Sequence, residues 1–327
     1  MAGIYTFTPN PCLDKSISVP VLLPDKKLHC TIDQVQPEGG GINVARVLKR
    51  LDLSAIAVLP AGGPTGDRLR QLLDDEGVDS LLVPAVHSTR ENIILTESAT
   101  QRQFRLGMPG EPLTHPEWEQ CLDVLAHAGG MEYLVVSGSL PEGAPTDLFH
   151  RIASIVQHQH ARLIVDSAGS SLQAALQAGV YLVKPNLSEL AGLYGKTALN
   201  ESQALEAARR LVDKGQANIV VVSMDARGAL LVTVDECYRA VPPVIKPRSS
   251  VGAGDSMVGG LVYALSKGFS LRDVLRRGIA CGSAAIMNPG TTLCRPSDVL
   301  AIEAEVQLFP LLLPSLAPGG GATITAV

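Results

Sequence analysis

The sequence has few aromatic residues, no dense cluster of basic residues and no long apolar stretch. Only 4% of its 327 residues are Phe, Tyr or Trp, whereas 46% are hydrophobic, so small and aliphatic side chains must supply most of the core. The buried strands of parallel sheets are continuous aliphatic runs, and this composition is therefore typical of an α/β protein. A chain of this length can form one large domain or two smaller ones.

These absences also exclude several kinds of partner. The net charge is −5 and Lys and Arg are nowhere concentrated, so we expect no nucleic-acid partner. No apolar run approaches the roughly 18 residues of a membrane-spanning helix, and no membrane partner is expected. The first residues lack the charged and apolar segments of a signal peptide, which predicts a cytoplasmic protein. The six cysteines include no Cys-x-x-Cys pair, so zinc ligands are not indicated.

Strand and helix patterns alternate along most of the chain. After residue 109 the aliphatic runs at 133–136, 163–165, 180–183 and 219–222 predict buried strands separated by helices. Polar residues follow each of these four strands, at the end where α/β folds bind ligands. Amphipathic helices are predicted at about 67–76, 255–267, 271–287 and 297–306. The pattern thus predicts a doubly wound, mostly parallel sheet flanked by helices.

Two segments differ from this pattern, at about 12–36 and 88–109. Their polar and apolar residues alternate, which indicates half-exposed strands rather than buried ones. They predict one small sheet outside the main fold, which could be a lid over a site or an oligomer surface. We expect the main domain to comprise residues 1–312 and the glycine-rich tail, 313–327, to be disordered.

The turn formed by Gly252, Ala253 and Gly254 leads directly into a predicted helix. Unpaired backbone N–H groups and the positive end of the helix dipole make such a turn an anion site. Asp255 follows, although a carboxylate repels a bound phosphate. Two interpretations remain open from the residues alone: Asp255 deprotonates a hydroxyl that attacks the phosphate, or it caps the helix.

Six motifs in order along the chain resemble those of the ribokinase (phosphofructokinase B) family. The likeness covers about residues 4–300, and its motifs lie at 8–14, 39–45, 60–63, 183–186, 251–256 and 282–285. The resemblance implies a ribokinase-like fold in which the small sheet is a lid. It also implies an ATP- and Mg²⁺-dependent sugar kinase, with K⁺ as a further cofactor and a homodimer formed through the lid sheet.

Within the family, the branch that phosphorylates sugar phosphates is the most similar. Residues 27–31, 108–110, 137–141 and 241–243, together with Arg90, carry this similarity. It implies transfer of the γ-phosphate of ATP to the 1-hydroxyl of fructose 6-phosphate, a reaction of glycolysis. The alternatives are a 1-phosphofructokinase, a tagatose-6-phosphate kinase and, from another class, a sensor of sugar phosphates without catalytic activity.

The resemblance assigns the catalytic and sugar-binding roles. It makes Asp255 the general base and the amides of residues 252–254 the anion hole, and it places the substrate's own phosphate on Arg90 and Lys27. The sugar would be bound by Asp14, Gly39, Gly40, Asn43 and Ser139. From the residues alone, Asp14 could instead form a local turn, and Lys27, Arg90 and Ser139 could be ordinary surface residues.

The resemblance likewise assigns the nucleotide and cation sites. ATP would be bound by Lys184, Asn186, Ser223, Gly228 and Ser283. Glu189 would hold Mg²⁺ through water, although Asn186 and Glu189 also have the spacing of a helix capping box. A monovalent cation would be bound by Ser249, Val251, Ala285, Asn288 and Gly290.

Four residues depart from the pattern of the sugar-phosphate branch. Glu38 stands in place of a fourth glycine beside the sugar site, and His29 replaces a second basic residue near Lys27. Asp225 replaces a glycine of the nucleotide loop, where an acid is unfavourable unless it points away from the phosphates. Leu23 replaces an aromatic residue associated with a second, inhibitory ATP site, so we do not expect that regulation to transfer.

Overall fold

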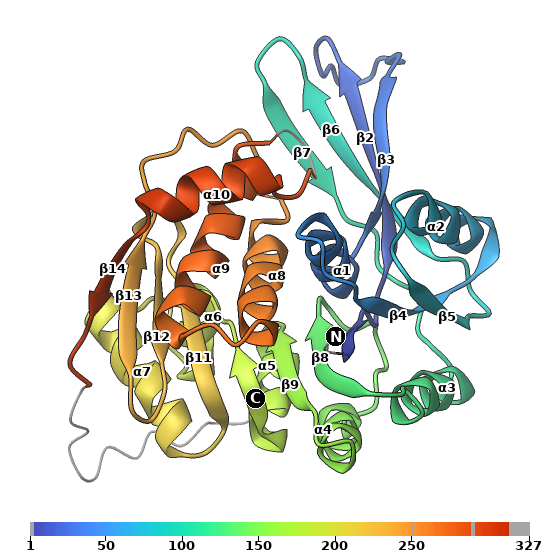
Figure 1. The fold of residues 1–327 in the computed structure, drawn as a ribbon. Coiled ribbons are helices and arrows are strands. Elements are labelled where there is room, and N and C mark those ends of the chain that lie inside the picture. The colour runs from blue at the N-terminus through green and yellow to red at the C-terminus, as the bar shows by residue number, and fades with distance from the viewer. Residues whose placement is uncertain (1–2, 250, 289–291, 314–327) are drawn as a thin grey trace.

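The computed structural model describes residues 3–249, 251–288 and 292–313, which form a large sheet between two layers of helices and a smaller sheet beside it (Figure 1). Gly290 and all but the first residue of the tail lie outside this part of the chain. Among the described helices, none is both long and apolar enough to cross a bilayer. The α/β fold class and the separate small sheet predicted from the sequence are confirmed.

The large sheet of the described chain has ten strands, and seven adjacent ones form a continuous parallel set. Its order is β14 (Gln307–Pro310), β13 (Cys237–Val241), β12 (Ala229–Val232), β11 (Ala217–Ser223), β10 (Val180–Val183), β9 (Arg162–Asp166), β8 (Met131–Ser137), β1 (Gly3–Phe7), β4 (Ile56–Ala61), β5 (Ser80–Pro84). The strands from β5 to β11 are parallel, and the last three, β12 to β14, are antiparallel. The sequence pattern missed two edge strands, β5 and β14, which are only five and four residues long.

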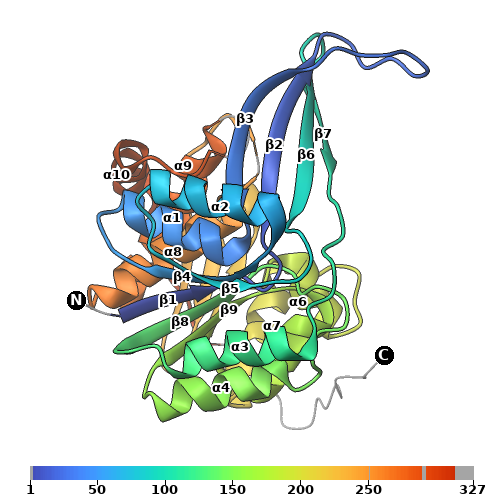
Figure 2. The same ribbon diagram turned by 90° about the vertical axis from the view of Figure 1, so that its right-hand side faces the viewer.

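Ten helices in the described chain cover the two faces of this sheet. One face carries α1 (Gly40–Arg50), α2 (Gly63–Asp75), α8 (Ala253–Ser266), α9 (Leu271–Ile286) and α10 (Pro296–Glu305). The other carries α3 (His115–Ala126), α4 (Leu148–His158), α5 (Gly169–Ala178), α6 (Leu187–Leu193) and α7 (Glu201–Asp213). The two groups of helices lie on opposite sides of the sheet (Figure 2). Successive strand residues face opposite layers: Leu134 and Val136 contact the second group, and Tyr133 and Val135 the first.

The small sheet has the order β3 (Thr31–Glu38), β2 (Cys12–Val19), β6 (Arg90–Glu97) and β7 (Arg102–Leu106). It stands off the main sheet above α1 and α2 (Figure 2). The alternating pattern predicted a strand over 16–22, but β2 ends at Val19. Pro20 follows and has no backbone N–H to donate to a neighbouring strand.

Candidate active site

Asp255 lies in the first turn of α8, three residues after a left-handed glycine. Gly252 has φ 69° and is the N-cap, so the interpretation of Asp255 as the helix cap is wrong. The Asp255 carboxyl is half-buried. Burial and the charge of Asp166 raise its pKa to about 6, although the Asn43 hydrogen bond and Lys184 act in the opposite direction. A carboxyl group with this pKa is suited to accept a proton near neutral pH.

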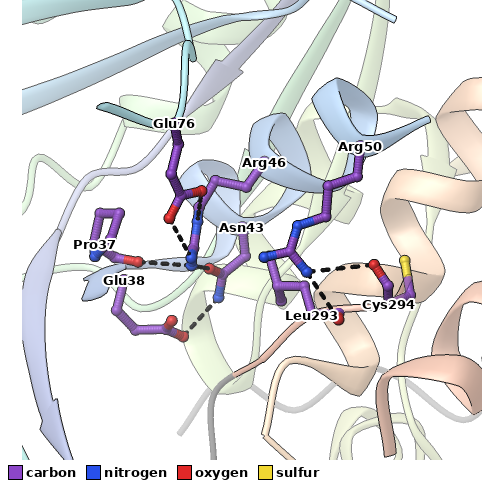
Figure 3. Close-up of polar contacts among 8 residues, drawn as sticks. All are labelled: Pro37, Glu38, Asn43, Arg46, Arg50, Glu76, Leu293 and Cys294. Atoms are coloured by element: carbon purple, nitrogen blue, oxygen red, sulfur yellow. Dashed lines mark hydrogen bonds and ion pairs between the residues drawn. The ribbon is translucent and has the colours of Figure 1, made fainter. Parts of the chain in front are cut away.

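A chain of polar contacts fixes Asn43 beside this carboxylate. The Asn43 Nδ2 atom donates to Asp255 Oδ2 at 2.8 Å and to Glu38 Oε1 at 2.6 Å. Its Oδ1 atom accepts from Arg46 at 3.2 Å, and the fully buried Arg46 guanidinium forms two 2.7 Å bonds to Glu76 (Figure 3). Because Arg46 can only donate, the Asn43 oxygen must face it, and the amide nitrogen must face the two acids.

A buried ion pair lies on the other side of the α8 N-terminus. Lys184 Nζ is 3.1 Å from Asp166 Oδ1, and a Cβ atom on Gly254 would lie 3.6 Å from that nitrogen. Asn186 and Glu189 form a complete capping box at α6, with each side chain bonded at 2.8 Å to the other's backbone N–H. The capping interpretation is therefore confirmed, while the Mg²⁺ role of Glu189 stays a prediction.

The predicted sugar-binding residues come from the base of the small sheet and from α1. Asp14 is 5% exposed, and its Oδ1 accepts from Asn92 Nδ2 at 2.9 Å. Arg90 donates to the carbonyls of Met108 and Asn10, both at 3.0 Å, so its guanidinium is fixed where the small sheet meets the main fold. These contacts exclude the interpretation of Arg90 as an ordinary surface residue, and Asp14 lies within the strand β2 rather than in a local turn.

A cleft of about 360 Å³ opens at the carboxyl ends of β8 and β9. The predicted Ser139 lies on its rim, exposed, and Asp255 and Glu189 both line it. At Gly40 a Cβ atom would lie 2.2 Å from Ser137 Oγ, so a residue without a side chain is required for α1 to begin this close to β8. Gly39 precedes it with φ 137°. The cleft is lined by Ser137, Gly138, Ser139, Leu140, Asp166, Ser167, Ala168, Ser171, Glu189 and Asp255.

The residues predicted to hold the nucleotide lie in separate elements around the same end of the sheet. Ser223, at the end of β11, forms a single parallel bridge with Asn186. Gly228 ends the short turn that connects β11 to β12, and Asp225 in that turn is exposed, with φ 51°. Ser283 is buried on α9, which packs against α8.

Lys27 lies far from the cleft and from the base of the small sheet. It is exposed in the loop of residues 20–30 between β2 and β3, which projects beyond the far end of the small sheet (Figure 2). Its role in holding the substrate phosphate therefore stays a prediction.

Four of the five residues predicted for a monovalent cation gather at the C-terminal end of α9. The Ser249 N–H donates to the Ile286 carbonyl at 3.3 Å, and its Oγ accepts from the N–H of Val251 at 3.2 Å. The Asn288 N–H donates to the Ala285 carbonyl at 3.1 Å. The fifth residue, Gly290, lies outside the described residues.

Three contributors to this arrangement were not assigned a role from the sequence. Asp166 follows a buried strand, and that position was a usable signal. Arg46 and Asn92 gave none, because their importance depends on partners 30 residues away for Arg46 and 78 for Asn92, a separation that only the tertiary fold closes.

The chain is similar to several known proteins over most of its length. It is 42% identical to the ATP-dependent 6-phosphofructokinase isozyme 2 of Escherichia coli over 305 residues, 93% of this chain and 99% of the relative. Solved structures of Escherichia coli phosphofructokinase-2 cover 93% of this chain and 99% of their own. They give TM-scores of 0.89 with potassium (42% identity), 0.87 with fructose-6-phosphate (41%) and 0.88 for a tetrameric inhibited form (41%).

The family comparison agrees with the fold and with the polar groups gathered at the sheet edge. The sequence model of the pfkB family of carbohydrate kinases matches residues 10–298, which include Asp14, Asn43, Lys184 and Asp255. The chain belongs to the pfkB family of carbohydrate kinases.

Proposed function

We propose that this chain is an ATP-dependent 6-phosphofructokinase, which transfers the γ-phosphate of ATP to the 1-hydroxyl of fructose 6-phosphate. The observation that carries the proposal is the position of Asp255, held by Asn43 in the first turn of α8 with a pKa raised to about 6. The Escherichia coli relative, 42% identical over 305 residues, is named an ATP-dependent 6-phosphofructokinase.

The chemistry follows from the first turn of α8. The Asp255 carboxylate accepts the proton of the attacking 1-hydroxyl. General-base catalysis of this kind accelerates the transfer about 10²–10⁴-fold. The N–H groups of residues 252–254 stabilise the charge that builds on the transferring phosphoryl group. Lys184 lies beside Gly254, where its ammonium group would neutralise the phosphates of ATP.

The acceptor is held at its other end by residues of the small sheet. Asp14 can accept hydrogen bonds from sugar hydroxyls, and outside the small sheet Gly39, Gly40, Asn43 and Ser139 would supply further contacts to the sugar. Arg90 binds the substrate phosphate from its fixed position at the base of the small sheet. Lys27 reaches a substrate phosphate only if its projecting loop meets a second copy of the chain.

The residues present fit a Mg²⁺ ion that is bound mainly by ATP. Among residues 3–249, 251–288 and 292–313, no three His, Cys, Asp or Glu side chains form a metal cluster. Mg²⁺ in kinases keeps several waters and uses one or two carboxylates plus substrate phosphates, a role open to Glu189 and Asp166 at the cleft. K⁺ would occupy the carbonyl-rich end of α9, and a potassium complex is known for the Escherichia coli relative.

Association through the small sheet is supported by an apolar row that crosses all four of its strands. Ile32, Ile17, Leu95 and Phe104 lie opposite one another in register, so they share one face. Ile32 is 68% exposed and Phe104 is 39% exposed. We propose a homodimer that covers this face; a tetrameric inhibited form is described for the Escherichia coli relative.

The proposed activity is tested by kcat/KM with Mg-ATP on fructose 6-phosphate, fructose 1-phosphate and tagatose 6-phosphate. We expect fructose 6-phosphate to be the best of the three. A higher value for either alternative would assign the chain to the corresponding kinase instead. No turnover of any of them, with binding retained, would favour a sensor.

A further inference from the structure

Glu38, the last residue of β3, presents one carboxyl oxygen to the catalytic network and the other to no protein group. Its Oε1 atom accepts from Asn43 Nδ2 (Figure 3). The same nitrogen also donates to Asp255. Its Oε2 atom is buried and has no hydrogen-bond partner in the described part of the chain. A buried polar atom without a partner is costly, so this oxygen is a candidate for contact with a ligand.

Two carboxylates and one cation surround this carboxyl group. Asp14 faces it from β2 and Asp255 from α8, and Arg46 is the nearby cation on α1. The Cys12 thiol on β2 carries no charge, because burial raises its pKa. Burial, followed by the charges of Asp14 and Asp255, raises the Glu38 pKa to about 8, against the opposing effects of Arg46 and the Asn43 hydrogen bond.

The position of the proton follows from these contacts. At pH 7 the carboxyl group is mostly uncharged, because its pKa lies above that pH. Oε1 already accepts the Asn43 hydrogen, so the proton resides on Oε2 and is available for donation. Asp14 and Asp255 can only accept while they are ionised, and Glu38 therefore adds the complementary donor.

We propose that Glu38 binds the acceptor sugar directly and donates the hydrogen of Oε2 to a sugar hydroxyl between Asp14 and Asp255. The inference rests on the proposed function, because it needs a hydroxyl-rich acceptor at this place. Glycine, which the resemblance to the sugar-phosphate branch implies at this position, offers no such donor. Glu38 thereby becomes a specificity-determining residue of this chain.

The proposal predicts that sugar binding takes up a proton. At pH 8, close to the Glu38 pKa, about half of the free protein lacks this proton, and binding restores it. Calorimetric titration of fructose 6-phosphate in two buffers of different ionisation enthalpy should give about 0.5 proton taken up per sugar bound. The substrate phosphate does not contribute, since its second pKa is about 6.

Glu38→Gln separates this role from a structural one. The amide can still accept from Asn43 and donate to the sugar, so affinity should stay within about threefold while the proton uptake disappears. Glu132→Gln, at an exposed position near the opposite end of β8, is the matched control and should keep the uptake. Binding by the wild type without proton uptake, or unchanged uptake in Glu38→Gln, would overturn the proposal.

A failure of the proposed function gives a different result. If fructose 6-phosphate is a poor substrate, the same titration is made with whichever of the three sugar phosphates has the highest kcat/KM. Proton uptake that depends on Glu38 is still expected there. If none of the three binds to the wild type, both proposals fail.

Discussion

At the scale of single residues, the acid beside the anion site is explained by its partners. An ionised Asp255 next to transferring phosphate is unfavourable unless it removes a proton, and the structure places it where Asn43 orients one oxygen. Asp225, the other acid expected to repel phosphate, is exposed and has a left-handed backbone that Asp tolerates better than most residues. The two acids therefore have different surroundings, and the catalytic role is proposed for Asp255 alone.

We expect the pKa of Asp255 to set the acid limb of the pH dependence of kcat/KM. Since the base must be ionised, kcat/KM should fall about tenfold per pH unit below pH 6. Asp166→Asn removes the charge that raises this pKa and should move the limb to lower pH. Initial rates between pH 5 and pH 8 measure both profiles.

The substrate phosphate also titrates near pH 6, and the variant provides the control. The ionisation of the substrate phosphate is the same with both proteins. A limb at the same pH in wild type and Asp166→Asn would therefore show that Asp255 does not set it.

At the scale of elements, the hydrophobic periodicity of the sequence was enough to predict those strands and helices that are long and regular in pattern. The helices α8, α9 and α10 begin and end within two residues of their predicted bounds. The edge strands β5 and β14 were missed because a run of four or five residues carries too little periodic signal. Within the site, motifs located Asp255 and Asn43, but no local pattern connects residues that are 212 positions apart.

The helix α1 shows what such local patterns omit. Arg46 has no exposed side-chain surface and is held by Glu76 from the region that follows α2. The Glu76 side chain is 33% exposed, so loss of this pair should cost less than the roughly 3–5 kcal/mol typical of a fully buried pair. The pair also holds Arg46 where it donates to Asn43 and so helps to orient that amide. In the sequence, Arg46 is one more polar residue on an amphipathic helix.

At the scale of the whole molecule, the small sheet leaves an apolar face exposed. An exposed apolar row on a sheet is typical of an interaction surface. We expect Phe104→Glu to shift a dimer toward monomer in sedimentation-velocity experiments, because it places a charge within the apolar row of the proposed interface. The rate per chain should fall as well if Lys27 acts across the interface.

Val86→Glu is the control for this variant. Val86 is 78% exposed and lies outside the four strands of the small sheet, so its substitution should leave assembly unchanged. A Phe104→Glu protein that sediments like the wild type would exclude this face as the interface.

The central claim is that Asp255 takes the proton of the 1-hydroxyl of fructose 6-phosphate. The most direct measurement is kcat with Mg-ATP for wild type and Asp255→Asn, with fructose 6-phosphate affinity measured on the same samples. The account predicts a loss of about 10²–10⁴-fold in kcat and an affinity within a few-fold of the wild type. An Asp255→Asn protein that binds the sugar phosphate and turns over at the wild-type rate would contradict it.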